Sequence, residues 1–229
     1  PMVAAFKNIL LVSNFESALV QCAFYGGYCF MAIPAAIFIW RFNYKQAILM
    51  GLALYSLGCL MFIPSGKMMV FEAFLFSYFV MTCGLSFLET SANPYILSMG
   101  NEATATQRLN LAQAFNPLGS LMGMFIAKEF ILAQLNSTSE EGRWELTQND
   151  PGLFTQIQQN DLNVIIRPYL MLGIVVAFVF VIFAVTKLPE SKNENVDKLN
   201  LRSTLKRLFS IRHSGPQLRY EPLKARFSA

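Results

Sequence analysis

The chain has 229 residues, of which 54% are hydrophobic and only 14% are charged. Soluble domains carry about 25% charged residues, so this composition argues against a soluble globular domain and favours a membrane protein. The formal net charge of +4 does not require a nucleic-acid partner, because the excess of Lys and Arg is concentrated near the carboxyl-terminal end. We therefore expect an all-α, polytopic membrane helix bundle without a nucleic-acid partner.

Long apolar runs separated by polar links predict the membrane helices. About 20 residues, at 1.5 Å each, cross a hydrocarbon core of about 30 Å. The first run follows neither an initiator Met nor a basic leader, and we interpret it as the end of a truncated first helix. In chain order we expect the end of helix one over residues 1–12, and helices two to six over about 15–40, 46–63, 70–97, 107–132 and 162–185.

Capping, proline and glycine signals mark where these helices begin and end. Ser13 and Glu16 have the spacing of a capping box at the start of helix two. Pro34 is expected to bend that helix, residues 64–66 to form a turn, and Pro94 to loosen the end of helix four.

Small residues in the predicted helices suggest close packing and no chemistry of their own. Gly119 and Gly123 have the spacing that lets two membrane helices approach closely. The cysteines lack the spacing of a metal site or a disulfide, so we expect small buried hydrophobic residues at Cys22, Cys29, Cys59 and Cys83. The single His is His213, and no nucleotide-binding or hydrolase motif is present. We predict no enzyme, no metal site and no cofactor.

Charges in the links indicate the orientation of the bundle. The link between helices two and three carries Arg41 and Lys45, whereas residues 134–161 are mainly acidic. Because cytoplasmic links of membrane proteins are enriched in Lys and Arg, the basic side is predicted to be cytoplasmic. We expect a transmembrane bundle over residues 1–188, with an extracytoplasmic loop at 134–161, and a basic cytoplasmic segment over 189–229.

One acid and three amides interrupt the apolar runs of helices four and five. Glu89 lies about 12 Å from the predicted end of helix four, and a carboxylate at such depth is costly unless it faces a polar cavity. Asn110, Gln113 and Asn116 follow at three-residue steps, which places them on one side of helix five. Gln113 and Asn116 lie about 9 and 14 Å from the same surface. The sequence therefore predicts a polar pocket near the middle of the membrane.

The chemistry of this predicted pocket favours an uncharged, hydroxyl-rich ligand. Amides and carboxylates pair with hydroxyl groups as both donors and acceptors, and no Lys or Arg is expected at this depth to bind an anion. Each candidate also has a structural interpretation: Glu89 as an acid hydrogen-bonded between helices, and Gln113 and Asn116 as amides that only join helices, at about 1 kcal/mol each.

Four further residues are secondary candidates for binding the ligand. Asn93 precedes a proline and Asn110 lies near a helix start, so both also suit a structural role. Tyr25 and Tyr28 on helix two fit the lining of a cavity and ordinary packing equally well.

The stretches LETSANPY at residues 88–95 and RLNLAQAFN at 108–116 resemble the sugar–proton symporters of the L-fucose and glucose/galactose permease family, within the major facilitator superfamily. The resemblance covers roughly residues 1–213, as the amino-terminal half of a transporter of about twelve helices. It implies proton-coupled symport of a neutral hexose such as glucose, galactose or L-fucose. It also implies a multi-pass protein of the bacterial cytoplasmic (inner) membrane.

The resemblance also implies roles and partners. The helix-four acid of the family falls on Glu89, with a role in sugar binding and proton coupling, and its sugar-binding amides fall on Gln113 and Asn116. The implied partners are a small neutral sugar, a proton, the lipid bilayer and the missing carboxyl-terminal half of the transporter.

The sequence departs from the family pattern in three places. The family's second acid, on helix one, would align before Pro1; the loop motif between helices two and three is reduced to Arg41 and Lys45; and the sequence diverges after His213. The alternative expectation is therefore a truncated, non-transporting membrane fragment or scaffold.

Overall fold

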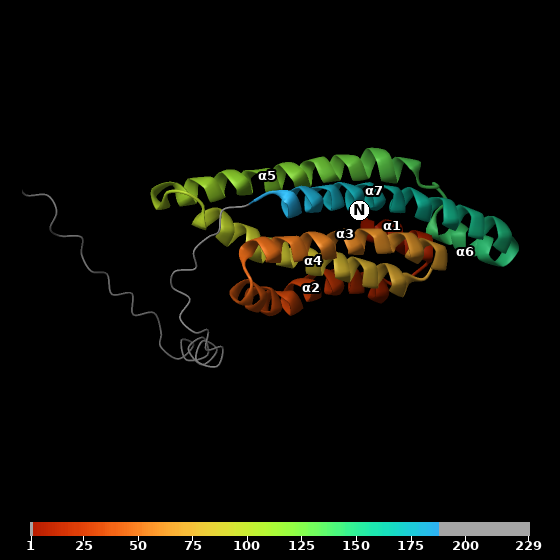
Figure 1. The fold of residues 1–229 in the computed structure, drawn as a ribbon. Helices are drawn as coiled ribbons and strands as arrows, with labels where there is room; N and C mark the ends of the chain where they lie inside the picture. The colour runs from red at the N-terminus through yellow and green to blue at the C-terminus, as the bar shows by residue number, and fades with distance from the viewer. Residues whose placement is uncertain (1, 188–229) are drawn as a thin grey trace, which may run out of the picture. The chain divides into compact units, whose positions relative to one another are not determined.

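The computed structural model describes residues 2–187, with side chains from residue 5 onward; the predicted basic segment at 189–229 lies outside the described residues. Every regular element in the described part is helical, as expected for an all-α bundle (Figure 1). In chain order these elements are α1 (Met2–Leu10), α2 (Asn14–Arg41), α3 (Tyr44–Met68), α4 (Phe71–Ser98), η1 (Glu102–Thr104), α5 (Ala105–Ile126), η2 (Ala127–Ile131), η3 (Leu132–Gln134), α6 (Glu140–Asn149) and α7 (Pro151–Val185).

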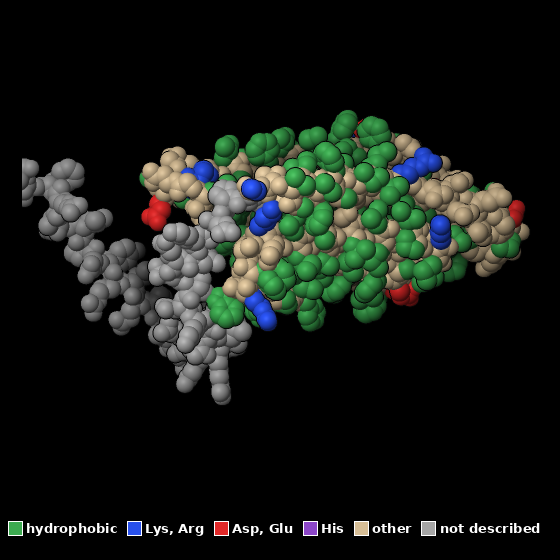
Figure 2. Space-filling view, viewed as in Figure 1, with side chains coloured by type: hydrophobic (Ala, Val, Ile, Leu, Met, Phe, Trp, Pro, Cys, Tyr) green, Lys and Arg blue, Asp and Glu red, His purple; other side chains and the backbone are tan. Residues whose placement is uncertain are grey.

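Four of the described helices, α2, α3, α4 and α7, are long and apolar enough to cross a membrane. The 22-residue α5 is also long enough, but it is not among the four, because polar residues such as Asn110 and Gln113 interrupt its apolar sequence. That α5 crosses the membrane therefore stays a prediction. Figure 2 shows hydrophobic side chains over the middle of the visible face, with Lys and Arg toward its two ends.

The helices alternate in direction, as a membrane bundle with short links requires. Lys45, at the start of α3, donates hydrogen bonds to the carbonyl oxygens of Ala184 and Thr186, at 3.1 and 2.7 Å. A cation at this position also interacts favourably with the negative end of the α7 dipole. The link between α2 and α3 and the end of α7 therefore lie at the same end of the bundle; which end is cytoplasmic stays a prediction.

The bundle is built around α3 and α4, with α2 packed on α4 and α7 packed on α3. A core cluster at one end joins Phe6 of α1, Phe62 of α3 and Ile165 of α7, all of which are buried. Serine hydroxyls also connect neighbouring helices. Ser56 donates to the carbonyl oxygen of Gly173 at 3.0 Å, and the hydroxyls of Ser65 and Ser77 lie 2.9 Å apart.

Two of the helix-end signals behave differently. The capping box is confirmed, because Ser13 and Glu16 each accept a hydrogen bond from the backbone nitrogen of the other. The predicted turn at residues 64–66 is wrong: α3 continues through it to Met68, and the left-handed backbone of Met69 (φ 52°) ends the helix. Ser65 is buried and donates to the carbonyl oxygen of Met61. Tertiary packing thus outweighs the local effect of proline, as it does in other membrane helices.

The predicted extracytoplasmic loop is largely helical. It contains α6, and α7 begins at Pro151 rather than at residue 162. Asp150 caps this helix by accepting a hydrogen bond from the backbone nitrogen of Leu153 at 3.0 Å, and Pro151 suits the first helical position. Likewise α4 stays helical through Pro94 to Ser98.

The cysteines are free thiols, but they do not share one environment. Cys59 and Cys83 are buried, as predicted, whereas Cys22 and Cys29 are exposed. The prediction fails on α2 because that helix has only a few buried residues and leaves the rest of its surface open.

Candidate functional site

Glu89 lies on α4, nine residues before the last helical residue, Ser98, which is about 14 Å along the axis. Its side chain is not covered by the described part of the chain. The hydroxyl of Tyr28, on α2, donates a hydrogen bond to Oε1 of Glu89 at 3.1 Å. Among the described residues no Lys or Arg forms an ion pair with this carboxylate.

Asn93 follows Glu89 one helical turn later, so both side chains lie on the same face of α4. Its Oδ1 atom accepts a hydrogen bond from Nε2 of Gln113, on α5, at 2.9 Å. This bond brings the amides of α4 and α5 together about one helical turn from the carboxylate. The structure therefore shows two interhelical hydrogen bonds one turn apart along α4, from Tyr28 to Glu89 and from Gln113 to Asn93. We call these four side chains the polar line.

Asn110 and Asn116 flank Gln113 at three residues on either side and are exposed, which places both near the same side of α5. Both amides make no side-chain hydrogen bond within residues 2–187 and are open to a ligand that donates and accepts hydrogen bonds.

Tyr25, like Asn110 and Asn116, makes no hydrogen bond to the polar line within the described residues. Its side chain is 66% exposed. Among the described residues, its ring has one aromatic neighbour, Phe24, in an edge-to-face arrangement at a centroid distance of 5.3 Å. Tyr28 is half-buried and reaches α4. The two tyrosines, equivalent by sequence, are therefore distinguished by the structure.

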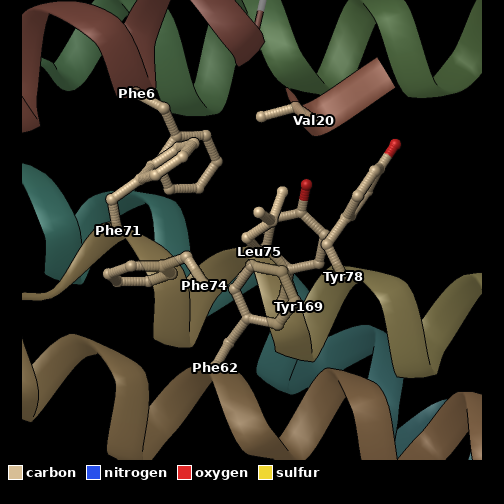
Figure 3. A pocket seen from close by; sticks show the side chains of 8 residues that line it. All are labelled: Phe6, Val20, Phe62, Phe71, Phe74, Leu75, Tyr78 and Tyr169. Atoms are coloured by element: carbon tan, nitrogen blue, oxygen red, sulfur yellow. The ribbon is translucent and has the colours of Figure 1, made fainter. Parts of the chain in front are cut away.

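A separate aromatic cluster lies near the start of α4. It lines a cavity of about 130 Å³. Figure 3 shows the lining side chains, which include Phe6, Phe62, Phe74, Tyr78 and Tyr169. The rings of Phe62 and Tyr169 are stacked at 4.2 Å. None of the predicted ligand-binding residues lines this cavity, so we assign it to packing of the bundle.

Sequence analysis missed a buried ion pair outside this site. Arg143 of α6 and Asp161 of α7 approach to 2.5 Å between Nη2 and Oδ2, with side chains only 2% and 3% exposed. Asp161 also accepts a hydrogen bond from the backbone nitrogen of Asn136, and Arg143 donates to the carbonyl oxygen of Asn136. The only available signal was one cation in an otherwise acidic stretch.

The donor sets of the described part do not suggest a metal centre. No group of three or more His, Cys, Asp or Glu side chains comes together there. The arrangement on α2, α4 and α5 instead offers one acid that can exchange a proton and several amides that can bind hydroxyl groups.

Known transporters resemble this chain over most of its length. The sequence matches the Major Facilitator Superfamily over residues 1–222. It is 46% identical over 211 residues to an L-fucose-proton symporter of Haemophilus influenzae, covering 91% of this chain and 49% of that protein. It is 31% identical over 215 residues to the L-fucose-proton symporter of Escherichia coli, covering 93% and 48%. A glucose/galactose transporter of Brucella abortus is 28% identical over 193 residues, covering 84% and 42%.

A solved structure resembles the whole fold as well. The crystal structure of the Major Facilitator Superfamily transporter FucP in the outward conformation superimposes with a TM-score of 0.76 at 31% identity. The match covers 92% of this chain and 51% of FucP. The chain thus spans about half the length of the relatives it matches.

Proposed function

The chain belongs to the Major Facilitator Superfamily, as a multi-pass integral membrane protein, and from that membership we propose that the whole protein is a proton-coupled symporter of a neutral hexose. This chain would supply one part of the transporter, and the part outside it would complete the sugar site. We place the protein in the bacterial cytoplasmic (inner) membrane, and we propose no enzymatic activity.

The observation that carries this proposal is the polar line across α2, α4 and α5. Glu89 is a carboxylate without a cationic partner among the described residues. In a low-dielectric region a bound proton would neutralise its charge. The hydrogen bond between Asn93 and Gln113 at 2.9 Å sets amides one turn away on the same face. Sugar hydroxyls and a proton can therefore be bound by side chains one helical turn apart, close enough for the binding of one to affect the binding of the other.

Among the sugars named for the relatives, L-fucose is favoured. The relative with 46% identity is an L-fucose-proton symporter, whereas the glucose/galactose transporter of Brucella abortus is 28% identical. The roles of Gln113 and Asn116 in binding sugar, with Asn93 and Asn110 as neighbours, belong to the same proposal.

The test is symport by the full-length protein in proteoliposomes, with Glu89→Gln as the decisive variant. Glu89→Gln keeps the shape of the side chain and cannot exchange a proton. We expect it to abolish proton-driven sugar accumulation while sugar exchange between the two sides continues. Competition by L-fucose, D-glucose and D-galactose identifies the preferred hexose.

Glu72→Gln is the matched control, because Glu72 is an exposed acid in the first turn of the same helix. It should accumulate sugar at the wild-type rate. Wild-type accumulation by Glu89→Gln would return Glu89 to a structural role, and failure of the wild-type protein to move any hexose would refute the function.

One observation favours the alternative for the chain by itself. No residue of α5 is buried in the described structure, so the helix that carries Asn110, Gln113 and Asn116 is only loosely attached to the bundle. We propose that this chain alone is a non-transporting fragment, and reconstitution of the 229-residue chain beside the full-length protein tests this directly.

A further inference from the structure

The hydrogen bond from Tyr28 to Glu89 connects two helices at the centre of the candidate site. Within the described part of the chain, the Glu89 side chain makes this one hydrogen bond, in which Oε1 accepts from the Tyr28 hydroxyl at 3.1 Å. Oε2 is left for another partner. A carboxylate fixed through one oxygen in this way presents the other oxygen in a defined direction.

The ring of Tyr28 is itself held in place. Phe24, one turn earlier on α2, contacts it at a centroid distance of 5.2 Å, and the ring of Tyr78 on α4 stacks on Phe24 at 6.2 Å. The backbones of α2 and α4 also approach closely here. A Cβ atom added at Gly27 would lie 3.0 Å from Thr82. The position of the Tyr28 hydroxyl is thus fixed by ring contacts and by the close packing of α2 on α4.

No other described side chain makes a hydrogen bond to Glu89. Asn93, which shares its helix face, accepts from Gln113 at 2.9 Å. Tyr25, three residues before Tyr28, is 66% exposed and makes no such bond within residues 2–187. The Tyr28 hydroxyl is therefore the group that orients this carboxylate.

We propose that Tyr28 is a positioning residue for Glu89: it binds Oε1 and leaves Oε2 for the proton. This inference rests on the proposed symport and assigns Tyr28 a role through Glu89 instead of a direct contact with sugar. Loss of its hydroxyl should weaken the link between proton and sugar movement and leave sugar affinity nearly unchanged.

Two measurements on the full-length protein test the proposal with Tyr28→Phe, and Tyr25→Phe is the matched control. Both substitutions remove one hydroxyl from α2 and keep the aromatic ring. The first measurement is the infrared carboxyl stretching band of Glu89 in acid, assigned by its absence in Glu89→Gln. Because a hydrogen-bonded carbonyl absorbs at lower wavenumber, the band should move upward in Tyr28→Phe and stay in place in Tyr25→Phe.

The second measurement compares sugar accumulation with sugar binding in proteoliposomes. Tyr28→Phe should lower accumulation about tenfold, as expected for loss of one hydrogen bond to a charged group, with less than a twofold change in the Kd for sugar. An unmoved infrared band in Tyr28→Phe, or an equal shift in Tyr25→Phe, overturns the proposal. A tenfold weaker Kd with unchanged coupling also overturns it, because Tyr28 would then be a sugar contact. If the wild-type protein moves no hexose, the symport function fails, while the infrared band still decides the role of Tyr28.

Discussion

Helices α3 and α4 on one side, and α5 on the other, show two different uses of small residues. Where α3 meets α4, glycines let the backbones touch: a Cβ atom at Gly84 would lie 2.7 Å from the carbonyl oxygen of Gly51, and one at Gly58 would overlap the backbone of Met81. In α5, Gly119 and Gly123 have no atom within 4 Å of the same constructed position. The same residue type therefore marks a formed contact in one region and an open surface in the other.

Among the described residues, the side-chain hydrogen bonds between α5 and other elements come from Arg108 at its start and from Gln113. At its start, Arg108 donates to the carbonyl oxygens of Asn101 and Leu97, at 3.0 and 3.4 Å. After its end, Ile131 is buried in a core cluster with Phe6 and Ile9. A spacing of small residues therefore predicts that a helix can pack closely against another. Whether it does so depends on whether a second helix lies opposite that face.

The largest expected effect concerns the buried ion pair between Arg143 and Asp161, which fixes the segment that follows α5. Arg143 and Asp161 are both buried and link the segment after η3 to α7. Arg143→Met leaves Asp161 buried without a counter-charge, so it should lower the free energy of unfolding of the chain in detergent micelles by about 3–5 kcal/mol.

The double variant Arg143→Met/Asp161→Leu is the control, because it removes both charges together. It should recover most of the stability, since paired replacement by apolar residues is often neutral. A single variant as stable as wild type in thermal unfolding would show that this ion pair does not hold the segment.

The second prediction compares the stability of two glycine substitutions, one between α3 and α4 and one in α5. Gly58→Ala should destabilise the chain by about 1–3 kcal/mol, because the added methyl group forces α3 away from α4. Gly119→Ala should be neutral or stabilise the chain by up to about 1 kcal/mol, because Ala has the higher helix propensity and meets no neighbour.

Unfolding of the 229-residue chain in micelles, followed by circular dichroism, compares the two variants. Equal losses of stability at positions 58 and 119 would mean that α5 packs as closely as α3 does, contrary to the structure. Repeating Gly119→Ala in the full-length protein shows whether a segment outside this chain covers α5.

The smallest effect concerns the single hydrogen bond between the middle of α5 and the bundle. A double-mutant cycle with Asn93→Ala and Gln113→Ala should give a coupling free energy of about 0.6 kcal/mol, as is usual for polar contacts between membrane helices. The same cycle with Asn93→Ala and Asn116→Ala serves as the reference and should give a value near zero. Equal coupling in the two cycles would be inconsistent with a specific bond to Gln113.

The candidate site could be predicted in its members but not in its connections. Glu89, Asn93 and Gln113 stand out in the sequence because each polar group interrupts an apolar run, where leaving it unpaired is costly. Helical spacing placed Gln113 on one side of its helix with Asn110 and Asn116. That Tyr28 reaches Glu89 while Tyr25 does not could not be read from the sequence, because both lie on the same helix and near the same face.

Composition and the length of the apolar runs by themselves determined that this chain is a helical membrane bundle, because only helices satisfy every backbone hydrogen bond within one apolar segment. The resemblance of residues 88–95 and 108–116 to the sugar–proton symporters determined the family, which the match over residues 1–222 confirmed.

The tertiary structure alone decided where helices continue and which side chains meet. It carried α3 through Pro64 to Met68, started α7 at Pro151, and buried Arg143 against Asp161. These outcomes depend on contacts between segments far apart in the chain. Spacing along a helix determines which face a residue occupies, but the helix opposite that face is determined by how the whole bundle packs.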